Sequence, residues 1–259
     1  DVDALVKNFI EMYYGPAAKH IQEYYDLAHK ELIAKSKEQF LDIYGFPLSY
    51  TKAHLRPDLM IEYKSIMDQA EKAVKNDEVY LDRVLRARLP VDFAYIDIAM
   101  NGGFEELSMI EETGEGKAVK PEMARLLNTV VANSQRSDNI RVNERNFTTE
   151  AYKEYALNKL KRLVADNLIV DAEVEIKSTY SEIYPVGGEQ AINDGLFGDL
   201  DFHNNWLGFE GHDMVVEIDM KEEKTFSGID MNFLKAVNSW VFLPVNIDVE
   251  ISDDGESFR

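Results

Sequence analysis

The chain contains no cysteine, which excludes disulfide bonds, thiolate chemistry and zinc sites built on cysteine. It has no apolar run long enough to span a membrane and no signal-peptide pattern. Because it opens in a helical pattern and closes in a turn, we expect it to be a piece of a longer protein. The motifs GxGxxG, GxxxxGK[ST], GxSxG and HExxH are absent, and the five histidines show no metal-ligand spacing. The chain therefore shows no active-site motif of its own.

Basic residues are scarce, since 28 Lys and Arg stand against 48 Asp and Glu, a formal net charge of -20. A chain this acidic without a basic patch is a poor partner for duplex nucleic acid, so we expect none. Most of the excess acid follows Asp171. Such a surface suits neutral or cationic ligands or bound calcium, and a merely solvated surface is the plainer interpretation.

Apolar residues recur at helical spacing through the first two thirds of the chain. The pattern predicts helices over 1–14, 17–32, 58–75, 78–100, 121–135 and 150–167. Pro90 should kink its helix rather than end it, because the apolar pattern continues beyond it. Asp97, on the apolar side after the kink, is the acid to test for burial, with a cap or an ion pair as the plainer role. We expect a helical bundle over 1–170.

From Asp171 the period changes from helical to alternating. Residues 172–176 alternate, 214–219 are typical of a strand, and Val245, Ile247, Val249 and Ile251 alternate with polar residues. Short strands between Gly and Asp turns indicate an antiparallel β-sandwich over 171–259 with one face in water. The predicted fold class is α+β multidomain, an all-α bundle followed by a jelly-roll-like and incomplete sandwich.

Two sets of motifs carry a family resemblance. The Asp194-Gly195 turn, WLGFEG at 206–211 and SWVFLP at 239–244 resemble an F5/8 type C (discoidin-like) domain. YYGPAA at 13–18, LRPDL at 55–59 and RARLP at 86–90 resemble a helical region of bacterial glycan-degrading proteins with an α-glucuronidase- or hexosaminidase-like architecture.

In proteins of that architecture a catalytic (β/α)-barrel precedes the helical region. The resemblance therefore implies the non-catalytic C-terminal portion of a secreted, periplasmic or cell-surface glycoside hydrolase, which supports the barrel and contributes carbohydrate binding. No catalytic residue carries over, because no position matches the family's active site.

The candidate sugar-binding residues are His203, Asn204, Trp206 and Trp240. An aromatic face stacks on a pyranose while amide and imidazole groups bond its hydroxyls. For both tryptophans, core packing is the favoured interpretation, since they lie in the segments that define the sandwich. Buried tryptophans would indicate a structural role, and an exposed one beside a groove would indicate sugar binding.

The resemblance also implies a structural Ca²⁺ near the DG turn, with Asp194, Asp199 and Asp201 as candidate ligands. Carboxylates are the hard oxygen ligands that this ion requires. The alternative is that these acids stabilise their turns through Asx hydrogen bonds.

Two other functions stay open. In the first, the sandwich is a purely structural or protein-contact module. In the second, the helices hold an unrecognised active site, which a buried acid with a strongly raised pKa in a cleft would indicate.

Overall fold

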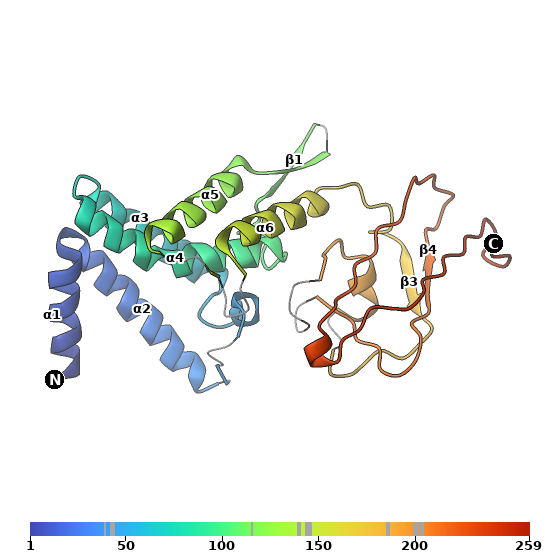
Figure 1. Cartoon of the computed structure of the whole chain (residues 1–259), viewed down its shortest axis with the longest axis horizontal. Coiled ribbons are helices and arrows are strands. Elements are labelled where there is room, and N and C mark those ends of the chain that lie inside the picture. Colours follow the sequence, from blue (N-terminus) through green and yellow to red (C-terminus); the bar gives the residue numbers. More distant parts are fainter. Residues whose placement is uncertain are drawn as a thin grey trace. The chain divides into compact units, whose positions relative to one another are not determined.

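The computed structural model describes residues 1–38, 40–41, 45–114, 116–138, 141–142, 147–184, 187–198, 202 and 205–259. The chain divides into two compact units, Asp1–Val164 and Ala165–Arg259, which are described separately below (Figure 1). The sequence pattern placed the change of architecture between residues 170 and 171, close to that division.

The first unit is helical, as the sequence pattern predicted. Its helices are α1 (Val2–Tyr14), α2 (Ala18–Ser36), α3 (Pro57–Val74), α4 (Glu78–Met100), α5 (Pro121–Arg136) and α6 (Thr149–Leu163). The 3-10 turns η1 (Gly15–Ala17) and η2 (Pro47–Tyr50) lie between them. The last helix ends at Leu163, before the predicted end at residue 167.

Local chemistry accounts for several helix starts. Asp77 caps α4, because its carboxylate accepts hydrogen bonds from the backbone N–H groups of Val79 (3.1 Å) and Tyr80 (3.2 Å). Thr148 caps α6 in the same way, through the N–H of Ala151 at 3.1 Å. Helices α3 and α5 begin with proline, whose missing N–H costs nothing in the first turn.

Helix α4 lies between two hydrophobic cores and continues through Pro90, as predicted. Val84, Val91 and Ile98 contribute to the core formed with α1, α2 and α3. Ile96 and Met100 contribute to the core formed with α5 and α6. Both faces of α4 are therefore needed to hold the helical unit together.

A β-hairpin that the hydrophobic pattern did not predict precedes α5. Strands β1 (Ile110–Thr113) and β2 (Gly116–Val119) pair antiparallel, with Ile110 opposite Val119. Gly116 has a φ of 111°, which a residue without a Cβ adopts readily. The sequence pattern suggested only a flexible interruption here, because neither strand shows a clear apolar alternation.

The second unit is built on one antiparallel pair. Strand β3 (Glu173–Ile176) pairs with β4 (Val216–Asp219), with Glu173 opposite Asp219. The 3-10 turns η3 (Gly188–Ile192) and η4 (Val237–Ser239) lie in its loops. The buried Asn193 amide donates to the carbonyls of Ile169 (3.0 Å), Val170 (3.2 Å) and Ala172 (2.9 Å), which fixes the segment leading into β3.

The prediction of a β-sandwich is confirmed only in part. The residues described here show antiparallel pairing but no closed sandwich or jelly roll. No strand forms over 245–251, where one was predicted, and the side chains of Val245, Ile247, Val249 and Ile251 are exposed. A sandwich buries such an alternating face against a second sheet, and the described chain supplies none for this segment.

Candidate functional site

Trp240 lies at the tip of a small hairpin in the second unit. Ala236 and Val241 exchange two backbone hydrogen bonds, of 3.0 and 3.1 Å, and η4 closes the loop between them. Within that loop the N–H of Trp240 donates to the carbonyl of Val237 at 3.0 Å. The hairpin therefore holds the Trp240 backbone in a defined position.

The Trp240 indole is presented to solvent, with 84% of the residue exposed. Phe242, 61% exposed, meets it edge to face with ring centroids 6.4 Å apart. The expectation that Trp240 packs into a core is thus wrong.

Trp206 is placed differently. Its ring lies against Gly198, where an added Cβ would come within 2.2 Å of the indole. The residue is partly buried, so the expectation of packing holds for this tryptophan. The other two sugar-binding candidates, His203 and Asn204, lie outside the described residues.

Of the calcium candidates, the structure describes Asp194 alone, and Asp199 and Asp201 lie outside the described residues. The Asp194 carboxylate accepts a 2.7 Å hydrogen bond from the N–H of Leu196, which is an Asx turn. Desolvation raises the pKa of Asp194 above its ordinary value, and the Leu196 hydrogen bond opposes that shift. No group of three metal-ligating side chains gathers within the described part of the chain. Calcium binding stays a prediction.

Asp97, singled out for its place on the apolar side of α4, is buried. Its carbonyl accepts a 2.8 Å hydrogen bond from the amide of Asn101, and the Asn101 oxygen accepts one from Lys159 of α6. Lys159, only 4% exposed, also donates to the Tyr155 hydroxyl at 3.4 Å. Sequence reasoning missed Lys159, although it follows Tyr155 by one helical turn on the apolar face of α6. These contacts form a polar link between α4 and α6.

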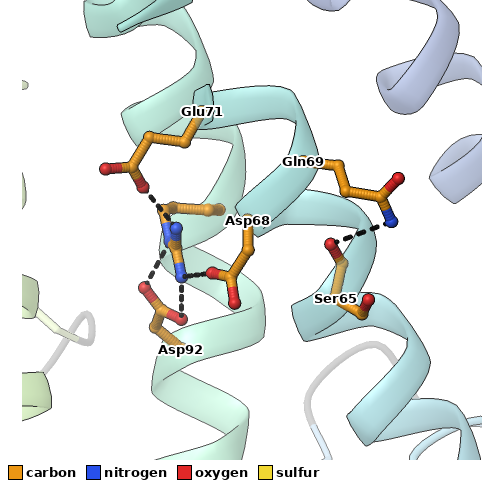
Figure 2. Close-up of polar contacts among 6 residues, drawn as sticks. Ser65, Asp68, Gln69, Glu71 and Asp92 are labelled. Carbon is orange, nitrogen blue, oxygen red and sulfur yellow. Dashed lines mark hydrogen bonds and ion pairs between the residues drawn. The ribbon is translucent and has the colours of Figure 1, made fainter. Parts of the chain in front are cut away.

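A second polar cluster, also missed, joins α3 to α4 around Arg88. The guanidinium donates to Asp92 at 2.9 and 3.3 Å, to Glu71 at 2.5 Å and to Asp68 at 3.0 Å. Figure 2 shows the three carboxylates around one guanidinium group. Burial lowers the pKa of Arg88, but the hydrogen bonds and charges of these acids outweigh it and raise that pKa above its ordinary value.

Neither polar cluster has the geometry of a glycosidase site. Hydrolysis of a glycosidic bond needs two carboxylates that face each other across a bound sugar. Here the three acids share a single arginine.

One open hollow on the helices is lined by Lys19, His20, Gln22, Glu23, Asp26 and Gln69, and another by Asp68, Glu71, Lys72 and Lys75. Asp97 and Lys159 line neither hollow. We therefore assign these two buried residues a structural role, which is to hold the helices together.

Comparisons with protein-family models, curated proteins and solved structures find no match to this chain. Among the described helices, none is long and apolar enough to cross a membrane.

Proposed function

We propose that this chain is the non-catalytic C-terminal portion of a glycoside hydrolase, and that its second unit binds carbohydrate through the Trp240 hairpin. The observation that carries the proposal is the exposed indole at the tip of a closed hairpin, with Phe242 beside it. The helical unit then supports a catalytic barrel encoded in the parent protein.

The hairpin offers the groups that sugar recognition needs. The C–H face of a pyranose is apolar and packs on an aromatic ring, while its hydroxyls need hydrogen-bond partners. Asn238 and Ser239 are exposed beside Trp240 in the same loop and supply an amide and a hydroxyl. A platform this open buries little of the ligand, so we expect weak binding, with a Kd of about 1 mM for a short oligosaccharide.

The Trp240 backbone also supports a functional role. Its φ of 59° and ψ of 24° are left-handed, which costs a residue with a Cβ about 1 kcal/mol. Strained conformations of this kind cluster at binding sites.

The motifs at 194–195, 206–211 and 239–244 support the rest of the proposal. On that resemblance the second unit belongs to a jelly-roll-like sandwich of the F5/8 type C kind, with a structural Ca²⁺ near Asp194 and a secreted, periplasmic or cell-surface location. These parts rest on the motifs, and the sugar-binding role rests on the hairpin.

Calorimetric titration tests the proposal. The chain is titrated with oligosaccharides of galactose, N-acetylglucosamine, glucuronic acid and xylose, with and without calcium. We expect one class to bind, and Trp240→Ala to weaken that binding at least about tenfold by removing the stacking face. Phe226→Ala is the matched control, since Phe226 is another exposed aromatic of the same unit and should leave binding unchanged. A folded chain that binds no member of the panel, or equal losses in both variants, would remove the sugar-binding role.

A protein-contact role is the second candidate, favoured by a separate feature. Residues 245–251 expose apolar side chains at alternate positions in the same unit.

A further inference from the structure

The segment over 245–251 lies outside the helices and strands of the structure, and Val245 lies in a bend. Residues 205–259 are all described, and within the described chain no backbone hydrogen bond joins 242–250 to any other segment. Immediately afterwards Ile251 and Arg259 exchange two backbone bonds of 3.0 Å, the start of an antiparallel pair. The segment thus ends where ladder pairing begins, and the backbone N–H and C=O groups of 245–250 are open to a partner.

Its sequence alternates apolar and polar residues, which lie on opposite faces when a segment is paired as a β-strand. Val245, Ile247, Val249 and Ile251 are between 45% and 106% exposed. The Asn246 amide donates to Asp248 at 2.8 Å, a contact between residues two apart that fits one shared face for these two polar side chains. An exposed edge with an apolar face is a template for pairing with another strand.

The charges of the segment indicate which strand fits. Asp248 and Glu250 have no basic partner among the described residues, and the nearest base that follows, Arg259, bonds Asp253 at 2.9 Å. In an antiparallel pair, directly opposite residues share a face, so opposite charges attract and like charges repel.

That rule disfavours a second copy of the chain. An antiparallel self-pair that keeps the apolar faces together sets Asp248 against Asp248, Glu250 or Asn246. Acids then face acids in most registers. A strand with lysine or arginine between its apolar residues has the complementary pattern.

We propose that residues 245–251 bind an added β-strand from a protein partner, in which apolar residues alternate with lysine or arginine. Backbone hydrogen bonds supply the pairing, the valine and isoleucine side chains meet apolar residues, and Asp248 and Glu250 meet the bases. This interaction is independent of the sugar-binding role of Trp240.

Fluorescence anisotropy with labelled peptides tests the proposal on the full chain. The probe is a short peptide in which valine alternates with lysine. One comparison peptide alternates valine with glutamate, and another has the probe's composition with its valines and lysines in separate blocks. We expect the probe to bind at least about tenfold more tightly than either, since only its alternation matches both faces.

A charge reversal separates strand pairing from general attraction to an acidic chain. In Asp248→Lys/Glu250→Lys the preference should turn to the glutamate peptide. Glu222→Lys/Glu223→Lys makes the same change in net charge at exposed positions of the same unit and should keep the preference for lysine. Trp240→Ala should leave peptide binding unchanged.

Three results would overturn the proposal. They are equal binding of the alternating and block peptides, no reversal in the Asp248/Glu250 variant, and a chain that sediments as a dimer through 245–251. The last would assign the edge to a second copy.

Discussion

The two units differ in where their apolar side chains lie. Every buried hydrophobic residue among those described belongs to Asp1–Val164, where Met60, Ile96 and Leu127 are almost fully enclosed. In Ala165–Arg259 the one buried residue of the described set is a polar one, Asn193, while many large apolar side chains are exposed.

The physical cause is the reach of the contacts that each architecture needs. A helix satisfies its backbone internally and then packs its apolar stripe against a neighbour. A strand satisfies its backbone only through another strand, and its apolar face only through a second layer. The helical unit therefore encloses two apolar cores with its own helices, whereas the large apolar side chains of the second unit are mostly exposed.

The largest expected effect tests how much the buried ion pairs stabilise the helical unit. Arg88→Met leaves the Asp92 carboxylate, 1% exposed, without its cation, and should lower the free energy of unfolding by about 3–5 kcal/mol. Arg86→Met is the matched control on the same helix, because Arg86 pairs with Asp82 near the surface and should cost about 1 kcal/mol or less. Chemical denaturation followed by the helical circular-dichroism signal measures both. Equal losses would mean that the Arg88 cluster contributes no more than a surface ion pair.

The next effect compares the units directly. Leu127→Ala, in the core of α5, should cost about 3 kcal/mol because it opens a cavity. Val249→Ala, on the exposed edge, should change stability by about 0.5 kcal/mol or less.

Each unit has its own signal for this measurement. Both tryptophans, Trp206 and Trp240, lie in the second unit, so their fluorescence follows its unfolding while circular dichroism follows the helices. A large loss in Val249→Ala would show that the edge is covered in solution and would break the comparison.

The same contrast explains what the sequence could predict. The bounds of α4 and its passage through Pro90 follow from residues within a few positions of one another, and they were predicted. The same local pattern singled out Asp97 as the acid to test for burial, and the residue is buried. The Arg88 cluster was not predicted, because Asp68 and Glu71 reach it from another helix.

In the second unit the local patterns were insufficient. The alternation at 245–251 predicted a strand that the structure does not form, because strand formation depends on partner segments far away in the sequence. For the same reason the motif containing Trp240 suggested a buried residue, and the structure exposes it. The hairpin at Trp240 is held by contacts between Ala236 and Val241, and its tip conformation has no clear signal in the sequence.

The smallest expected effect has the opposite sign. Trp240→Gly should stabilise the second unit by about 0.5–1 kcal/mol, because glycine adopts the left-handed backbone without the Cβ penalty. Trp240→Ala removes the indole but keeps a Cβ at the same φ, so it should bring no such gain. Trp206 fluorescence during denaturation reports the difference, and both variants should lose the sugar binding proposed above. A gain in stability with a loss of binding would mean that the indole is held at a cost to the fold. If Trp240→Gly instead destabilised the unit by more than about 1 kcal/mol, the contact between Trp240 and Phe242 would be structural, and the second unit would be more like the first than its exposed surface indicates.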